Sequence, residues 1–595
     1  MNSIRLFLLA AVTLMAACNS PEQHKTANQP FDFKQWSDSC FEADLLENPM
    51  FLTRLGRKEN YDQLNDISDS ANLAYFDKIE NRLLEIKSID TTGFNSDTKL
   101  SYQLLREDLA FQLENKKFRL HNYPVNQMHG AQSELPSFMI NNHKIDSLSD
   151  AKAYISRING IEVYFEQLLE KLDIRSNNGI SVPLFSYDYM INDCDNIMGN
   201  GTSEDHILYK DFLSKIEKLS FDESIQTALL DDLKSSISTV LVPSYQKLKD
   251  YLIEHKKTAS KDDGVWKFPN GKEYYDYRLK FITTTDWSAE KIHQTGLDEV
   301  ARIHGEMKDI MNKVRFKGDL KSFFQFMKND DQFYYENGAE GKKKMIDGYT
   351  AIIDSMRLKL DELFLTKPKA PLVVKAVEAY REKSAGKAFY DNGSIDGSRP
   401  GYFYANLYEM KDMPTYEMEA LAYHEGIPGH HMQISIAQEM TGIPEFRKHL
   451  DYTAYVEGWG LYCEFLPKEY GFYKNPYSDF GRLAMELWRA CRLVVDAGIH
   501  AKKWTREEAI QYLQDNTPNS YNSCKKAIER YIVMPGQATA YKVGMIKILE
   551  IREKAKQAMG DKFDIKKFHD IFLLSGPVPL NVFEKSIDNW IKENS

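Results

Sequence analysis

The chain has 595 residues, of which 43% are hydrophobic, and its 76 Lys and Arg against 87 Asp and Glu give a formal net charge of −11. A chain of this length buries a large core and would usually fold into two or more domains, and an evenly spread negative charge argues against nucleic acid as a partner. Beyond residue 20, no apolar run approaches the length of a membrane span, so the composition indicates a globular body.

The first 30 residues have the pattern of an export signal followed by a tether. Residues 1–17 combine Arg5 with an apolar run and end in small residues, which predicts a signal peptide. The sequence MAAC, ending at Cys18, resembles a bacterial lipobox, which implies a lipidated cysteine; ordinary secretion with cleavage near Ala17 is the alternative. Residues 18–30 are polar and lack periodicity, as a tether would. We therefore expect a protein of the bacterial envelope that faces the periplasm and contacts the membrane only through Cys18.

Most of the remaining sequence has the apolar periodicity of α-helices. Residues 345–364 form an apolar stripe that is halted by Pro368, and Thr505 to Glu508 have the spacing of a capping box that opens a helix ending near Asn516. Other predicted helices cover residues 83–89, 100–113, 151–172, 225–254, 288–314 and 484–502.

Residues that favour β-strands cluster mainly in VVKAVEAY and GYFYANLY, around residues 376–404. We therefore expect a mainly α-helical protein, one large body in two lobes, with a small β-sheet near the motif described next. An N-terminal helical region would cover residues 31–265, and a catalytic region would cover residues 266–595.

The segment YHEGIPGHHMQ, residues 423–433, resembles a stretched H-E-x-x-H zinc motif. On a regular helix, His424 and His430 lie roughly 9 Å apart along the axis and point away from each other, whereas His424 and His431 share a face about 10.5 Å apart. Neither pair could place both nitrogens about 2.0–2.1 Å from one zinc ion. Pro428 and Gly429 require a kink or bulge. A bulge that absorbs two residues would bring His430 into place, and one that absorbs three would bring His431.

Together with YVEGWGLYCE, this motif resembles the bacterial family called domain of unknown function 885 (DUF885), whose members are often described as lipoproteins. The resemblance covers roughly residues 271–580 and extends to the segments GKEYYDYRLKFITTT, RPGYFYANL, RLVVDAGIH and ERYIVMPGQATAYKVG. The family looks like a distant relative of helical zinc peptidases such as thermostable carboxypeptidases, thimet-type oligopeptidases and angiotensin-converting enzyme, although Pro428 interrupts the metal helix that is unbroken there. The resemblance implies a zinc-peptidase-like body with a deep central cleft and one Zn²⁺ per chain, bound by His430 with His431 as its neighbour.

In this interpretation, His424 and His430 bind Zn²⁺ as neutral imidazoles, and Glu425 is the general base for the attacking water. The alternative is a polar helix cap around the Pro-Gly kink. A third ligand must leave one position open for water. Glu457 fits, because the glycines on either side of Trp459 permit the close approach of another helix; an ion-paired glutamate is the alternative. Glu464 is the fallback ligand or a hydrogen-bond partner of one.

Amide hydrolysis also needs donors to the carbonyl oxygen. By resemblance to the helical peptidases, His500 and Tyr541 would be these donors, and Asp496, one turn earlier, would orient His500; both donors could instead be ordinary core residues.

Candidate substrate-binding residues lie in two further places. Arg489, Arg492 and Arg530 could bind the terminal carboxylate of a peptide or form structural ion pairs. GYFYANLY could be an edge strand that pairs with an extended peptide, with Asn406 in the cleft, or it could be an ordinary buried strand.

The sequence thus favours a zinc-dependent peptidase, an exopeptidase or oligopeptidase whose partner is a short peptide. One alternative is a metal-dependent hydrolase of a non-protein amide, and another is an envelope lipoprotein that binds peptide or metal without turnover. Glu425 favours catalysis, because a binding protein has no need of a carboxylate beside its first metal ligand.

Overall fold

The computed structural model describes residues 31–199, 203–379, 382, 385–394 and 399–594. The predicted signal peptide at 1–17, the lipidation site Cys18 and the tether at 18–30 lie outside these residues. Among the described helices, none is long and apolar enough to cross a membrane.

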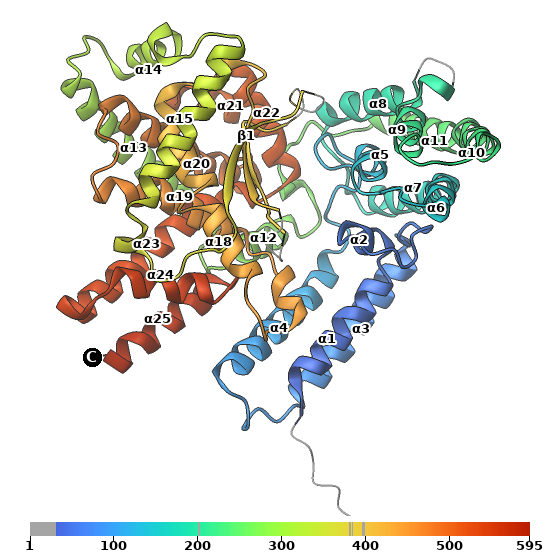
Figure 1. The fold of residues 1–595 in the computed structure, drawn as a ribbon, viewed down its shortest axis with the longest axis horizontal. Helices are drawn as coiled ribbons and strands as arrows, with labels where there is room; N and C mark the ends of the chain where they lie inside the picture. The colour runs from blue at the N-terminus through green and yellow to red at the C-terminus, as the bar shows by residue number, and fades with distance from the viewer. Residues whose placement is uncertain (1–30, 200–202, 380–381, 383–384, 395–398, 595) are drawn as a thin grey trace, which may run out of the picture.

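The fold is mainly α-helical, as the sequence predicts, and Figure 1 shows two lobes joined along one side. The helices before residue 265 are α1 (Phe33–Leu46), α2 (Pro49–Arg54), α3 (Asp69–Lys87), α4 (Ser96–Glu114), α5 (Ala131–Asn141), α6 (Leu148–Asn159), α7 (Ile161–Asn177), α8 (Leu184–Met198), α9 (Ile207–Ile216), α10 (Glu223–Ser236) and α11 (Val242–Lys256). Helices α5 to α11 form the smaller lobe, drawn in teal and green in Figure 1.

The larger lobe contains the helices that follow residue 265. They are α12 (Gly271–Thr283), α13 (Ala289–Lys313), α14 (Leu320–Asn329), α15 (Ala339–Arg357), α16 (Leu360–Leu363), α17 (Met418–Glu425), α18 (His430–Gln438), α19 (Thr453–Glu469), α20 (Pro476–Ala501), α21 (Arg506–Asn516), α22 (Tyr521–Val533), α23 (Ala540–Met559), α24 (Ile565–Leu574) and α25 (Leu580–Asn594). The capping box predicted at Thr505 and Glu508 is present at the start of α21.

Three predicted helices are interrupted in the structure. The stretch at 345–364 is divided between α15 and α16. The stretch at 151–172 is divided between α6 and α7 at Gly160. The stretch at 225–254 runs through α10 and α11, which are joined by a π-helical turn at Ile237–Leu241. The wider π turn lies directly before Pro243, where a regular helix would bring the proline ring against the carbonyl of residue 239.

The small sheet lies beside α17 and α18, and its strand order is β1-β3-β2. Strand β1 (Leu372–Ala376) pairs with β3 (Gly401–Ala405) in parallel, and β2 (Ala388–Asp391) pairs with β3 antiparallel. The interpretation of GYFYANLY as an edge strand is therefore wrong: β3 is central and paired on both sides, and Phe403 is fully buried. An extended peptide cannot pair with β3.

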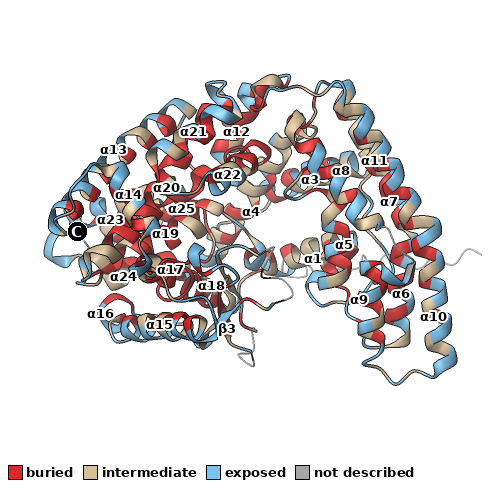
Figure 2. Ribbon diagram, turned by 90° about the horizontal axis from the view of Figure 1, so that it is seen from above, coloured by how far each residue is buried: buried red, intermediate tan, exposed pale blue. Residues whose placement is uncertain are grey.

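Two hydrophobic cores hold the molecule together, and each contains residues from both sides of position 265. One core joins α5–α11 to α12–α14 and α20–α22, while the other joins α1, α3 and α4 to the sheet, α15–α19 and α23–α25. Buried residues are dense where α17, α18, α19 and α20 meet (Figure 2). The division into regions at 31–265 and 266–595 stays a prediction.

Candidate metal centre

The stretched motif folds as two helices separated by a tight turn. Helix α17 ends at Glu425 and α18 begins at His430, so residues 426–429 leave the helix altogether. A Cβ atom on Gly429 would lie 2.0 Å from the carbonyl oxygen of His424, which requires glycine at this position. The indole Nε1 of Trp459 donates to the Pro428 carbonyl at 3.0 Å and holds the turn. The turn carries the His430 ring back to the His424 ring, with 4.6 Å between their centroids.

Three predicted ligands meet at this turn. Nε2 of His424 lies 3.5 Å from Oε2 of Glu457, and Nε2 of His430 lies 3.6 Å from the same oxygen. One ligand atom from each of the three residues lies within 4.8 Å of the others. Two atoms bound at about 2.05 Å to one tetrahedral ion are roughly 3.3 Å apart. Two imidazoles and a carboxylate at these separations therefore fit a zinc ion.

Two glycines in α19 allow this arrangement. A Cβ atom on Gly460 would lie 2.6 Å from Cε1 of His424, so the metal-site ring occupies the space over the glycine. A Cβ atom on Gly458 would lie 2.6 Å from the Cα atom of Gly544 in α23, so the two helix backbones touch. Gly460 leaves room for the His424 ring, and Gly458 allows α23 to approach the part of α19 that contains Glu457.

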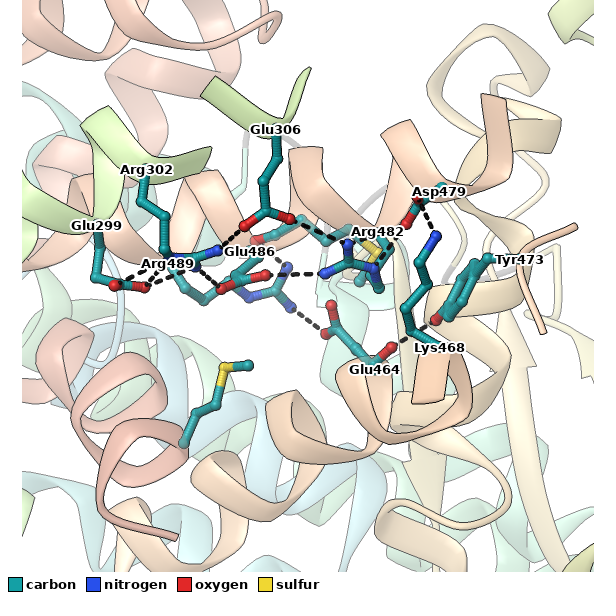
Figure 3. A network of polar contacts seen from close by, with 12 residues as sticks. Glu299, Arg302, Glu306, Glu464, Lys468, Tyr473, Asp479, Arg482, Glu486 and Arg489 are labelled. Carbon is teal, nitrogen blue, oxygen red and sulfur yellow. Dashed lines mark hydrogen bonds and ion pairs between the residues drawn. The ribbon is translucent and has the colours of Figure 1, made fainter. Parts of the chain in front are cut away.

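Glu464 is a hydrogen-bond partner of the predicted ligand His424 and is not itself one of the three predicted ligands. Its Oε1 lies 2.8 Å from Nδ1 of His424, the ring nitrogen opposite the one that faces Glu457. Tyr473 donates its hydroxyl to the backbone carbonyl of Glu464 at 2.7 Å, and a guanidinium nitrogen of Arg489 lies 3.6 Å from Oε1 (Figure 3). The carboxylate thus fixes the orientation and tautomer of the His424 ring.

The electrostatics of the site favour a positive charge between the ligands. Burial lowers the pKa of His424, but hydrogen bonds to Glu457 and Glu464 outweigh it and raise this pKa to about 10. Burial raises the pKa of Glu457, but hydrogen bonds to His424 and His430 outweigh that effect and hold this pKa well below its usual range. Two carboxylates around one imidazole, Glu464 buried and Glu457 partly buried, leave a net negative charge that a cation can neutralise.

Glu425 ends α17 next to the first histidine. Its side chain is nearly buried, at 8% exposed, and it has no hydrogen-bond partner among the described residues. A buried carboxylate that no described residue hydrogen-bonds, directly after His424 in the chain, is consistent with the predicted role of general base.

His431 points away from the three ligands and toward the sheet. Its Nδ1 lies 3.1 Å from the hydroxyl of Tyr390 and 3.4 Å from that of Ser435. Burial lowers its pKa to about 4, so the ring is neutral. The structure thus selects His430, and not His431, as the histidine that meets His424.

Tyr541 lies near the metal centre together with the three arginines. Its ring centroid is 4.4 Å from the guanidinium carbon of Arg492 and 5.8 Å from that of Arg489. Burial raises the pKa of Tyr541, and the negative charge of Glu457 raises it further. At ordinary pH the phenol therefore keeps its proton and can donate it in a hydrogen bond.

A buried ion network fixes the helices that carry these residues. Glu486 of α20 accepts a hydrogen bond from Lys542 of α23 at 2.6 Å and pairs with Arg482 at 3.1 Å. Arg302 of α13 pairs with the same glutamate (Figure 3). The network ties α13, α20 and α23 together, and Lys542 is the immediate neighbour of Tyr541.

The prediction that His500 donates to the carbonyl oxygen of a substrate is wrong. Its Nδ1 accepts from the backbone N–H of Val265 at 3.2 Å, and its Nε2 donates to the carbonyl of Tyr531 at 3.0 Å. Burial lowers its pKa to about 4, so the ring is neutral and its single N–H is already used. His500 is a structural residue that joins α20 to the chain before α12 and to α22.

Asp496 and Asn406 also have roles other than the predicted ones. Asp496 does not orient His500; its Oδ1 accepts from the Tyr275 hydroxyl at 2.6 Å and from the backbone N–H of Gly536 at 3.0 Å. Asn406 does not point into a cleft; its amide donates to the carbonyls of residues 382, 385 and 386. Both side chains shape turns, and a sequence gives no sign of which backbone groups a buried polar side chain will reach.

Comparisons with known proteins agree with this architecture. Residues 49–587 match the family described as "Bacterial protein of unknown function (DUF885)". No curated protein matches the chain.

Several solved structures resemble the chain. A crystal structure described as "the putative lipoprotein from Colwellia psychrerythraea" has 30% identity and a TM-score of 0.86, with 94% of this chain and 98% of that chain covered. A "putative lipoprotein of unknown function from Shewanella oneidensis" has 18% identity and a TM-score of 0.75, with 93% and 99% covered. A "putative oligoendopeptidase F from Bacillus anthracis str. Ames" covers 87% of this chain and 96% of its own at 11% identity, but its TM-score of 0.24 is too low to bear on the fold.

Proposed function

The chain belongs to the bacterial family DUF885, and we propose that it is a zinc-dependent hydrolase of peptide bonds, an exopeptidase or oligopeptidase that acts on short peptides. The observation that carries the proposal is the convergence of His424, His430 and Glu457, with Glu425 directly after His424 and without a hydrogen bond from any described residue. A site that only stored metal would have no use for that free carboxylate.

The residues around the three ligands have complementary tasks. When bound, a zinc ion supplies Lewis-acid chemistry, which makes water a stronger acid and polarises a carbonyl group. Glu425 takes the proton of the attacking water and delivers it to the leaving amine. Tyr541 keeps its proton and donates a hydrogen bond to the carbonyl oxygen as negative charge develops there. Glu464 holds the His424 ring in the tautomer whose Nε2 faces the other ligands.

The cellular place that we propose is the bacterial envelope. The Colwellia and Shewanella structures are each described as a "putative lipoprotein". The lipobox-like sequence at Cys18 in this chain supports the same location, with the body facing the periplasm and a short peptide as the partner.

Metal analysis combined with a peptidase assay tests the proposal. We expect about one zinc per purified chain, and hydrolysis of short peptides that a chelator stops and added zinc restores. Glu457→Ala should lose both zinc and activity. Zinc binding without hydrolysis of any peptide would favour the alternative of a lipoprotein that binds metal or peptide without turnover. Hydrolysis of only non-peptide amides would indicate a metal-dependent amidohydrolase instead.

A further inference from the structure

Three arginines near the metal centre have buried guanidinium nitrogens without partners. These atoms are Nε of Arg489, Nε and Nη1 of Arg492 and Nε of Arg530. Arg492 is only 9% exposed, and the side chain of Arg489 is 13% exposed. Buried polar groups are nearly always hydrogen-bonded, and charged ones even more so. Unpartnered nitrogens on three neighbouring arginines therefore indicate a site that can bind an anion.

The protein supplies only limited negative charge to this group: Glu457 acts on Arg492, and Asp496 acts on Arg530, through space and without an ion pair. The Glu464 carboxylate lies 3.6 Å from a terminal nitrogen of Arg489. Neither Arg492 nor Arg530 has an ion pair with any described residue; they contact the Tyr531 ring instead, at 5.8 and 5.4 Å from its centroid, and Arg530 donates to Gln537. Structural arginines of this chain have their nitrogens hydrogen-bonded, as Arg482 has to Glu486 and as the fully buried Arg157 has to Gln63, His143 and Thr53.

Arg492 and Arg530 also line a cavity of about 410 Å³. Its other walls include the rings of Trp488, Tyr531 and Tyr189 of α8, and Met128 before α5. Lys526 and Glu529 also line it, and the Glu529 carboxylate is paired with Arg506. A volume of this size suits a small organic group, and aromatic walls with a few polar groups are typical of ligand pockets. Residues from both lobes line this cavity, which is partly open to solvent.

Arg492 connects this cavity to the proposed metal centre. Its guanidinium carbon lies 4.4 Å from the Tyr541 ring centroid on one side and 5.8 Å from the Tyr531 ring centroid on the other. The contact of Gly458 with Gly544 brings the first turn of α23, which contains Tyr541, beside Glu457. The arginine therefore lies between a predicted metal ligand and the cavity that it lines.

We infer that Arg492 and Arg530, supported by Arg489, bind the α-carboxylate of the substrate's C-terminal residue, whose side chain enters the cavity. This inference rests on the proposed function and narrows it to a carboxypeptidase. A planar guanidinium matches a carboxylate with two parallel hydrogen bonds, which gives specificity for a free C-terminus. Hydrolysis breaks the C–N bond that precedes this residue, adds the hydroxyl of water to the acyl carbon, and transfers the proton through Glu425 to the new amino group.

The test compares N-acetyl-alanyl-phenylalanine with its C-terminal amide on purified, zinc-loaded protein. In the Glu425→Gln background, which prevents turnover, we expect the acid to bind at least tenfold more tightly than the amide by calorimetry. Arg492→Met should abolish this preference. Arg492→Lys, which keeps the positive charge and its contact with the two rings but not the fork of donors, should lose most of it. Arg54→Met, on an exposed arginine of α2, is the matched control and should retain it.

Each result decides the inference separately from the proposed function. Equal binding of acid and amide, binding of neither, or an acid preference that survives Arg492→Met would overturn the inference. Equally fast zinc-dependent hydrolysis of both compounds would uphold the peptidase and overturn the carboxypeptidase. Hydrolysis of neither compound would contradict the proposed function. A preference for the acid that is lost in Arg492→Met would still establish the carboxylate site in that case.

Discussion

Nδ1 of His424 lies 2.8 Å from Oε1 of Glu464, and Nε2 of the same ring faces Glu457 at 3.5 Å. The two glutamates come from one helix, α19, seven residues apart, and they contact opposite nitrogens of one imidazole. A carboxylate behind a ligating histidine fixes its tautomer and makes the ring a better donor to a metal. The geometry thus gives Glu464 and Glu457 different tasks, although both are glutamates on the same helix.

Glu464→Ala should weaken zinc affinity about 10- to 100-fold without removing a ligand. Glu464→Gln should lose less, because its amide oxygen still accepts the hydrogen bond from His424. Competition with a chromogenic chelator measures both affinities. Glu469→Gln, a surface change on the same helix, is the matched control and should bind zinc as the wild type does. Unchanged affinity in Glu464→Ala would show that the hydrogen bond does not support the site.

Glu425→Gln should keep about one zinc per chain and lose about 10²- to 10⁴-fold in kcat, because an amide cannot accept the proton of water. Metal content and peptide hydrolysis are measured on the same preparation. Loss of zinc would make Glu425 a ligand or a supporting residue, and full activity would remove it from the mechanism.

The sequence predicts the metal centre better than its surroundings. The spacing of His424 and His430 shows that a straight helix cannot bring both rings to one metal ion, and Pro428 shows where the helix must be interrupted. The number of residues that leave the helix decides whether His430 or His431 meets His424. That number depends on the Trp459 indole of α19, which hydrogen-bonds to the Pro428 carbonyl. No local pattern contains that contact.

Polar residues farther from the motif show the same limit. His500 and Asn406 are residue types that are common in active sites, yet both donate to backbone carbonyls. His500 bonds to α22, and Asn406 bonds to a loop about 20 residues before it. The helical periodicity located helices such as α4, α13 and α15, because it reflects burial of one face. It did not reveal that β3 is the central strand, since strand order is set by pairing between segments.

Gly460→Ala should abolish or greatly weaken zinc binding, because its Cβ atom would lie 2.6 Å from Cε1 of the His424 ring. The ring must shift, and a ligand displaced by even a few tenths of an ångström leaves the separations that suit zinc. Metal content and Tm are the measurements. Gly305→Ala, in a helix with no heavy atom within 4 Å of the added Cβ, is the control and should raise Tm slightly. Normal zinc content in Gly460→Ala would show that His424 is not held against α19.

Asp496→Asn should remove a pH dependence from the stability of the fold. Asp496 is fully buried, its Oδ2 has no partner, and burial outweighs its hydrogen bonds from Tyr275 and Gly536 and raises its pKa to about 7. Because the folded chain binds this proton more tightly than the unfolded chain, the stabilisation is complete below about pH 4. It is lost as pH rises toward 7, and it amounts to up to about 4 kcal/mol at 1.36 kcal/mol per pKa unit.

An asparagine at position 496 still accepts both hydrogen bonds through its oxygen and cannot ionise. We therefore expect Asp496→Asn and wild type to have similar Tm values near pH 4.5, and the variant to be the more stable protein at pH 8. Asp286→Asn, on an almost fully exposed aspartate, should follow the wild type at both pH values. A Tm difference that is the same at pH 4.5 and pH 8 would mean that the Asp496 carboxyl does not titrate in this range. Its negative charge would then be stabilised by Arg278 and Arg530.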